Sequence, residues 1–143
     1  MVTINDSAYT HRKIIKVACA LIEDDLGNIL VAQRSSKMSL PLKWEFPGGK
    51  VEENETVEST IIREIYEELN LQITIIEQLP SFIHHYEDFS ITLIPFICQI
   101  EQGAIKLVEH KAFCWASPDN LLDLDLAAAD IPVALYYLNI LKK

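Results

Sequence analysis

The stretch IIKVACALIE at residues 14–23 constrains the fold more than any other part of the sequence. Nearly every residue in it is apolar, and it begins with two β-branched isoleucines. A strand with one solvated face alternates apolar and polar residues, whereas a strand covered on both faces is apolar throughout. The stretch therefore predicts a strand with other layers packed on both of its sides.

Apolar runs and turn residues alternate along the rest of the chain. DDLGN at 24–28 leads into a second strand, 29–35, which predicts a hairpin. Residues 36–50 carry two prolines and two adjacent glycines, which is typical of a loop. The other predicted elements are helix 56–69, strands 71–79, 90–100 and 112–117, a short helix opened by Ser117 and Pro118, and a final helix from Asp130 and Pro132 to about Leu141. Pro95 indicates a bulge or an edge position. This alternation predicts an α/β fold with a mixed sheet covered on both faces.

Length and charge limit the class of protein. A chain of 143 residues predicts one domain, residues 1–143, with a loose polar tail at residues 1–11. The net charge of −9 argues against a nucleic acid polymer or an anionic membrane as partner. A polyphosphate ligand would need metal cations to neutralise the contact. The sequence gives no indication of the oligomeric state.

The cysteines and apolar runs predict a compartment. Cys19, Cys98 and Cys114 are scattered, odd in number and set in apolar runs, which favours buried reduced thiols over a disulfide framework. No apolar run reaches the length of a membrane span, and the first is followed by EDD rather than by a cleavage-like site. We therefore expect a soluble, cytoplasmic protein.

The predicted helix 56–69 is unusually acidic on one side. At about 100° per residue, its buried stripe consists of Ile61, Ile62, Ile65 and Leu69. Glu68 falls inside this apolar arc, where a carboxylate is costly unless it is paired or coordinated. A solvated face with Arg63 paired to Glu67 would explain Glu64 and Glu67, and a side chain that reaches the edge of the stripe would explain Glu68.

A bound cation is the alternative explanation of these glutamates. Three carboxylates at a core boundary repel one another unless a cation holds them, and oxygen ligands suit Mg²⁺ or Mn²⁺. Gly48 and Gly49, just ahead of the helix, let the backbone approach such a ligand closely, although an ordinary turn would also use them.

Residues 49–71 closely resemble the Nudix box. The matching pattern is Gly49, five residues, Glu55, seven residues, and then Arg63, Glu64, Ile65, Tyr66, Glu67, Glu68, Leu69, Asn70 and Leu71. Asn70 stands where the family usually has glycine, and asparagine is the next best residue for a positive φ. VAQR, WEFPGGK, EHKAFCW and LAAADIPV extend the resemblance to MutT-like members over about residues 13–140. The resemblance implies the α/β/α Nudix sandwich.

The resemblance also implies a metal site. Glu67 and Glu68 match the principal metal ligands, and the carbonyl of Gly48 and the carboxylate of Glu64 would contribute. The alternative role for Glu64 is to orient the water rather than to bind metal. Glu109 matches a carboxylate outside the box that binds metal or acts as base, so the general base is either Glu64 or Glu109.

Further residues take supporting roles by the same resemblance. Arg63 and Glu55 match the pair that holds the carboxylates in place. Lys50 and Arg34 match phosphate contacts. Trp44 and Phe46 lie beside the glycines and are candidates to wall a base pocket, with core packing as the equal alternative.

The implied reaction is hydrolysis of a nucleoside triphosphate, of cytidine type or with an oxidised base, to the monophosphate and pyrophosphate. Dinucleoside polyphosphates or nucleotide sugars are the alternative substrates, and only Tyr86 and Pro95 loosely match the motifs of those subgroups. A non-catalytic sensor is a third possibility, but such domains usually lose box acids that this chain keeps.

Asp130 is the candidate for base recognition. An isolated aspartate before a helix would favour an N-cap. In MutT-like enzymes the matching position faces the base, and an ionised aspartate only accepts hydrogen bonds. It would therefore favour a base with an amino group, such as cytosine, and would suit guanine only if Asp130 were protonated or the guanine turned another edge toward it.

Overall fold

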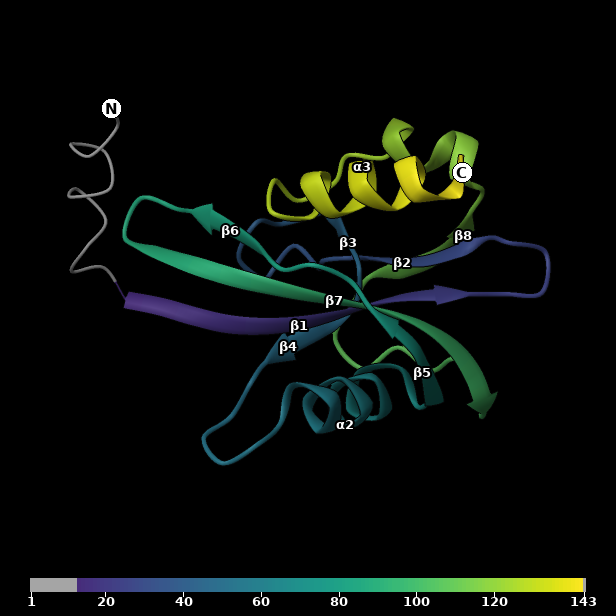
Figure 1. The fold of residues 1–143 in the computed structure, drawn as a ribbon, viewed down its shortest axis with the longest axis horizontal. Helices are drawn as coiled ribbons and strands as arrows, with labels where there is room; N and C mark the ends of the chain where they lie inside the picture. Colours follow the sequence, from purple (N-terminus) through teal and green to yellow (C-terminus); the bar gives the residue numbers. More distant parts are fainter. Residues whose placement is uncertain (1–12, 143) are drawn as a thin grey trace.

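The structure is a computed structural model and describes residues 13–142. Within this range eight strands form one sheet, and helices pack on it (Figure 1). The elements are β1 (Lys13–Glu23), β2 (Ile29–Gln33), β3 (Trp44–Glu45), β4 (Gly48–Lys50), α2 (Val57–Leu69), β5 (Gln72–Gln78), β6 (Phe82–His85), β7 (Phe89–Gln102), β8 (Ala112–Ala116), the 3-10 helix η1 (Pro118–Asp123) and α3 (Asp130–Leu141). The predicted loose tail at residues 1–11 lies outside the described residues.

The long strands β1 and β7 form the centre of the sheet. They pair in parallel along all of β1, from Lys13 opposite Phe89 to Glu23 opposite Gln99. Every other strand pairing in the described range is antiparallel: β2 and β4 pair with β1, β5 and β6 with β7, and β3 and β8 with β2. The predicted mixed sheet is confirmed. Parallel strands need a long crossover connection, and here that connection contains α2.

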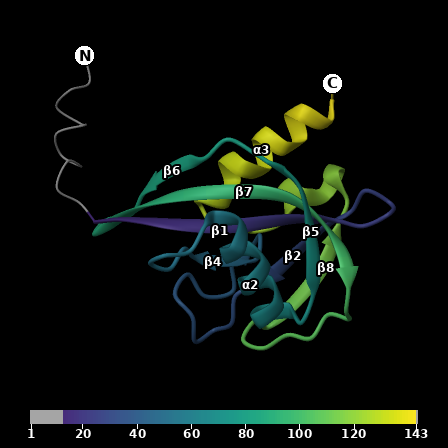
Figure 2. The same cartoon turned by 60° about the horizontal axis from the view of Figure 1, so that its bottom comes forward.

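The two α-helices cover opposite faces of the sheet (Figures 1 and 2). Successive residues of a strand point to opposite faces, so β1 contributes to both cores. Leu21 packs in a core cluster with Tyr137 of α3. The next residue, Ile22, packs in a second cluster with Ile65 of α2. The prediction of a first strand buried on both faces is confirmed for residues 18–22, whereas Ile14 at its start is 59% exposed.

Helix α2 begins and ends at the predicted residues. The side chain of Thr56, its N-cap, accepts a hydrogen bond from the amide of Ser59 at 3.0 Å. Asn70 follows the last turn in the left-handed conformation, with φ 61° and ψ 31°, and its amide donates to the carbonyl of Tyr66. The short cap residues thus satisfy backbone groups that the helix itself leaves unpaired.

The predicted buried stripe of α2 needs one correction. Ile61, Ile65 and Leu69 are fully buried, but Ile62 is 44% exposed and Thr60 is buried instead. The buried face is therefore centred on Ile61 and Ile65, and Ile62, which is one step of about 100° further round, faces solvent.

The predicted loop at 36–50 was wrong in its second half, because it contains two short strands. β4 pairs with β1, with Gly48 opposite Cys19 and Gly49 opposite Ala18. β6 was also missed, and it pairs with β7 from Phe82 opposite Leu93 onward. Strands this short cannot show an alternation of apolar and polar residues. They are strands only because they pair with neighbouring strands in the sheet.

Pro95 lies neither on an edge strand nor at a break in the β1–β7 register. It is opposite Cys19 in the interior strand β7. On the other side of β7, β6 pairs only as far as Leu93 and β5 begins at Phe96. Pro95, which has no backbone N–H, therefore lies where the partner of β7 changes from β6 to β5. A missing hydrogen bond between strands is tolerated at such a position.

The cysteine prediction holds with one adjustment. All three cysteines are free, and Cys19 and Cys98 are buried, whereas Cys114 is half-buried. Between residues 13 and 142, no helix has the length and apolar character needed to span a membrane.

Gly48→Ala should severely destabilise the protein. A Cβ at Gly48 would lie 1.9 Å from the carbonyl oxygen of Ala18, a backbone atom fixed by the β1–β4 pairing. We expect a loss of about 3 kcal/mol or more in the free energy of unfolding, measured by urea denaturation of the metal-free protein. Gly27→Ala is the control, because Gly27 has open space around it and a φ of +83°, and it should lose only about 1 kcal/mol. Equal losses for the two variants would contradict the prediction.

Candidate active site

A cavity of about 610 Å³ is lined by residues that lie far apart in the sequence. Its floor includes Val17 and Cys19 of β1, and its wall includes Phe89 of β7. The charged and imidazole side chains that line it are Arg34, Glu45, Lys50, Glu68, Glu109, His110 and Asp130. This size and this mixture of apolar and convergent polar groups are typical of a small-molecule site.

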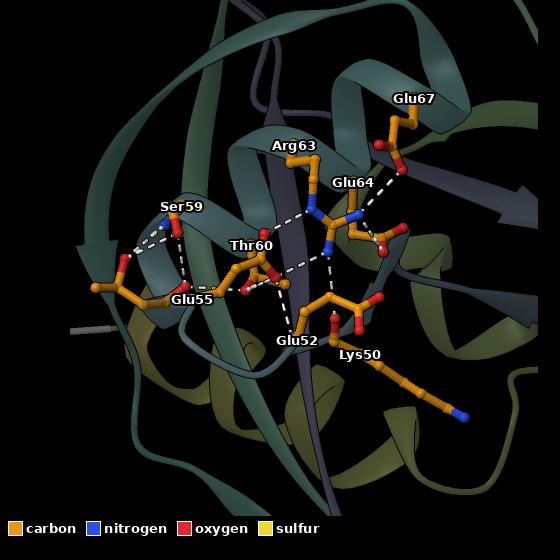
Figure 3. Close-up of polar contacts among 9 residues, drawn as sticks. Lys50, Glu52, Glu55, Ser59, Thr60, Arg63, Glu64 and Glu67 are labelled. Carbon is orange, nitrogen blue, oxygen red and sulfur yellow. Dashed lines mark hydrogen bonds and ion pairs between the residues drawn. The ribbon is translucent and has the colours of Figure 1, made fainter.

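Arg63 organises the acidic side of α2 (Figure 3). Its guanidinium donates two hydrogen bonds to Glu55, at 2.6 and 2.9 Å. A third nitrogen, Nη1, donates to Glu64 and to Glu67, at 3.0 Å each. One cation thus fixes three carboxylates, and a fork-to-fork pair such as Arg63 with Glu55 also fixes the orientation.

Glu55 is itself held from several directions. Besides Arg63, it accepts hydrogen bonds from the amide of Glu52 at 3.0 Å and the hydroxyl of Thr60 at 2.9 Å. The bonds from Arg63 and then from Glu52 lower the pKa of Glu55 to about 2. Glu55 is therefore ionised at neutral pH and can anchor Arg63 permanently. The structure brings these two residues together as the resemblance implies.

Glu68 lies beside Glu64 on the side of α2 that faces the cavity. Burial, followed by contact with the carboxyl group of Glu64, raises the pKa of Glu68 far above its ordinary value. The Oε1 atom of Glu68 is buried and has no hydrogen-bond partner in the described part of the chain. A buried carboxylate oxygen without a donor is destabilising unless a proton or a cation satisfies it.

The glycine pair lets the backbone approach these carboxylates. A Cβ on Gly49 would lie 2.2 Å from Cδ of Glu64, so no larger residue fits beside that carboxylate without movement. Gly48 and Glu68 line the same cavity. Backbone and carboxylate oxygens therefore meet at one corner of the cavity, which we call the acidic corner (Gly48, Gly49, Glu64, Glu68 and Glu109). Glu64 lies against Gly49 there but is not among the residues that line the cavity.

The acidic corner has the donor chemistry of a hard divalent cation. All of its donors are oxygens, as Mg²⁺ and Mn²⁺ prefer, and the unsatisfied oxygen of Glu68 points to a missing positive charge. Across residues 13–142, however, no three His, Cys, Asp or Glu side chains are arranged to hold a metal ion. Glu67 is 56% exposed and bonds to Arg63. The structure thus brings Glu64 and Glu68 together and leaves Glu67 turned toward Arg63.

Glu109 and His110 reach the cavity from the segment between β7 and β8. Glu109 lines the cavity, and its charge contributes to the raised pKa of Glu68. His110 is 8% exposed, and its Nε2 lies 2.8 Å from Oε2 of Glu45. A carboxylate only accepts, so Nε2 carries the proton of this bond. The structure therefore places Glu109 next to the box despite the distance in sequence.

Arg34, one of the two predicted phosphate contacts, lines the cavity and is bonded to other protein groups. Its guanidinium donates to Glu45 at 2.8 Å and to the carbonyl and hydroxyl of Ser39, at 2.5 and 3.0 Å. It therefore ties the loop 35–43 to Glu45. Lys50, the other predicted phosphate contact, is exposed at the cavity.

The two aromatic candidates for the base pocket, Phe46 and Trp44, lie in different surroundings. Phe46 is 3% exposed and lines the cavity. Trp44 is not among the lining residues; it packs against the core cluster on the α3 side and bonds through its backbone to Asp125 and Ala127. Phe46 also belongs to that core cluster, so core packing describes both residues, and only Phe46 lies where it can wall a base pocket as well.

Asp130 is the first residue of α3, and its side chain does not cap the helix. The N-cap residue is Ala129, and the helix has no side-chain cap bond. Instead, Oδ2 of Asp130 accepts a hydrogen bond from the amide of Phe46 at 2.9 Å inside the cavity. Burial and then the charge of Glu45 raise the pKa of Asp130 to about 8. At neutral pH this carboxyl group is therefore mostly protonated.

Sequence reasoning missed several cavity residues. Phe89 has no role in the sequence-based prediction, yet it lines the cavity beside Tyr86, and the centroids of the two rings lie 5.1 Å apart. Glu45 was given no role, yet it bonds to both Arg34 and His110. The one feature of the sequence that could have drawn attention to Glu45 is its position between the aromatic residues Trp44 and Phe46.

Comparison with known proteins decides the family. The model of the NUDIX domain matches residues 13–137. The chain belongs to the Nudix family. It is a Nudix hydrolase, and the predicted Nudix sandwich is confirmed.

Relatives of named activity align with most of this Nudix chain. It is 38% identical over 121 residues to a CTP pyrophosphohydrolase from Escherichia coli (strain K12), which covers 85% of this chain and 89% of the relative. It is 36% identical over 103 residues to an 8-oxo-dGTP diphosphatase from Proteus vulgaris, which covers 72% of this chain and 90% of the relative. A solution structure of a MutT protein of the Nudix hydrolase family from methicillin-resistant Staphylococcus aureus 252 aligns with a TM-score of 0.73 and 41% identity, over 90% of this chain and 98% of that one.

Glu68→Gln should stabilise the metal-free Nudix protein as the pH rises. The raised pKa of Glu68 means that the folded state holds its proton more tightly than the unfolded state, for which the ordinary value is 4.5. Stability is therefore lost in the wild type from about pH 5 upward, and glutamine has no such loss. Melting temperatures from pH 5 to 9 in EDTA should favour Glu68→Gln by an increasing margin, whereas the exposed Glu67→Gln should show no such trend. A large loss in Glu68→Gln at pH 8 would instead make Glu68 a structural partner.

Proposed function

We propose that this Nudix protein hydrolyses nucleoside triphosphates to the monophosphate and pyrophosphate. The observation that carries the proposal is the buried, unsatisfied oxygen of Glu68 beside Glu64, at the edge of a cavity with the size of a small-molecule site. The relatives named as a CTP pyrophosphohydrolase and an 8-oxo-dGTP diphosphatase support the substrate class.

The proposed cofactor is Mg²⁺ or Mn²⁺, since Nudix hydrolases generally need divalent cations. Glu64, Glu68, Glu109 and the carbonyl of Gly48 would hold it, joined by Glu67 once that side chain leaves Arg63. A cation bound there would neutralise phosphate oxygens and would lower the pKa of a water molecule.

The protein's own residues have separable tasks in the reaction. Arg63, itself fixed by Glu55, holds Glu64 in the acidic corner. Glu64 or Glu109 takes the proton of the attacking water, and Lys50 at the cavity binds a phosphate oxygen. Phe46, Tyr86 and Phe89 give the base an apolar wall on which it can stack.

Asp130 is proposed to read the base. The sequence-based preference for bases with an amino group assumed an ionised Asp130. The raised pKa of this carboxyl group changes that expectation. With a pKa of about 8, Asp130 can donate as well as accept at neutral pH and can match a guanine lactam. Once ionised, it only accepts and favours the amino group of cytosine or adenine. The groups that face it from other elements are Glu45, Arg34, Cys19 and Tyr86.

Activity should depend on a divalent cation and on the acidic corner. Incubation with CTP or 8-oxo-dGTP and Mg²⁺ should yield monophosphate and pyrophosphate by phosphorus NMR, and excess EDTA should abolish turnover. Glu67→Gln and Glu68→Gln should each lower kcat by about a hundred-fold, because each removes a charged ligand. Glu58→Gln, exposed on the same helix, is the matched control. Release of orthophosphate as the main product would refute the proposed reaction.

The base preference should change with pH through Asp130. In the wild type, kcat/KM for dCTP relative to dGTP and 8-oxo-dGTP should rise as the pH increases through about 8, because the carboxyl loses its donor. Asp130→Asn keeps both donor and acceptor at every pH, so its ratio should be flat. At pH 9 the substitution should shift the ratio toward guanine nucleotides by about ten-fold. Identical pH profiles for the two proteins would remove Asp130 from base recognition.

A further inference from the structure

The last carbonyls of α2 are satisfied by a segment that lies far along the chain. A helix leaves its final carbonyls without partners of its own. Here the carbonyl of Leu69 accepts from the amide of Lys106 at 3.0 Å, and the carbonyl of Glu68 accepts from the amide of Val108 at 3.3 Å. The segment 103–108, between β7 and the cavity residue Glu109, is therefore the cap of the acidic helix.

The segment alternates between two kinds of contact. Ile105 and Leu107 pack against the core cluster that contains Leu69 of α2. Lys106 and Val108, the residues next to them, use their amides on the helix end. This period of two is that of extended backbone, so sliding the segment by one residue would exchange its core side for its solvent side.

Asn70 makes two contacts with this segment. Together they fix which residues of the segment lie opposite the end of α2. Its side-chain amide donates to the carbonyl of Ala104 at 3.3 Å. Gly103 packs against its backbone, because a Cβ on Gly103 would lie 2.6 Å from the carbonyl oxygen of Asn70, and the φ of Gly103 is +111°. Asn70 also holds the left-handed conformation that ends the helix. A glycine would supply that conformation but not the side-chain bond.

We propose that Asn70 is a positioning residue that fastens segment 103–108 to the end of α2 and so holds Glu109 in register with Glu68. Glu109 directly follows Val108, whose amide is bonded to Glu68. On its other side, His110 bonds to Glu45, and the amide of Lys111 donates to the carbonyl of Gln33 at 2.9 Å. Glu109 is thus held between two anchored stretches. The catalytic part of this proposal rests on the proposed function.

Hydrogen exchange tests the anchoring without any nucleotide or metal. Asn70→Gly keeps the left-handed conformation and removes only the side chain, so the protein should fold with an unchanged or higher melting temperature. In metal-free protein the amides of Lys106 and Val108 should exchange about five-fold faster than in the wild type. Asn70→Asp, which has the same shape but no donor, should behave in the same way. Unchanged exchange at both amides in Asn70→Gly would overturn the proposal.

A double-mutant cycle tests whether Asn70 acts through Glu109. Asn70→Gly should lower kcat about five-fold in the wild-type background and produce no further loss in the Glu109→Gln background. The Glu67→Gln background is the matched control, because Asn70→Gly should still lower kcat about five-fold there. Equal losses in the wild-type and Glu109→Gln backgrounds would overturn the positioning role.

A wild-type protein that hydrolyses no nucleotide would refute the proposed function, and the exchange rates would still decide the anchoring.

Discussion

The site depends on the interaction of one guanidinium with three carboxylates. Arg63 bonds to Glu55, Glu64 and Glu67, and without it these like charges would repel one another on one side of α2. Because Glu55 is ionised and bonded from three directions, it anchors Arg63 against the loop before the helix. Beside this pair, Glu68 keeps a buried oxygen, Oε1, that has no hydrogen-bond partner within residues 13–142. This unsatisfied oxygen is the observation on which the proposed cation site rests.

Glu45 joins the acidic corner to the base end of the cavity. Its two oxygens bond to Arg34 and to His110, and its charge raises the pKa of both Glu68 and Asp130. A single short strand, β3, therefore carries a charge that acts on both Glu68 in the acidic corner and Asp130 at the other end of the cavity. Burial is the largest cause of the raised pKa of both Glu68 and Asp130, and the negative charge of Glu45 adds to it in each case.

Local chemistry allowed much of the fold and part of the site to be predicted. The uninterrupted apolar run of β1 required cover on both faces, and the caps of α2 at Thr56 and Asn70 follow from side-chain chemistry alone. The spacing of Arg63 and the glutamates identified the family. By contrast, β3, β4 and β6 were not predictable, because they are too short to carry a periodic signal and exist only through pairing with β1, β2 and β7.

The sequence by itself determined the helix that carries the carboxylates and the chemistry that those carboxylates can perform, because both depend on residues within a few turns of one another. Tertiary structure alone decided the protonation of Asp130, the engagement of Arg34 by Glu45, and the placement of Glu109 beside Glu68. Those properties depend on burial and on charges from distant elements. Neither can be read from neighbours in the chain, because contacts between distant segments, such as the pairing of β2 with β3 that places Arg34 near Glu45, bring these groups together.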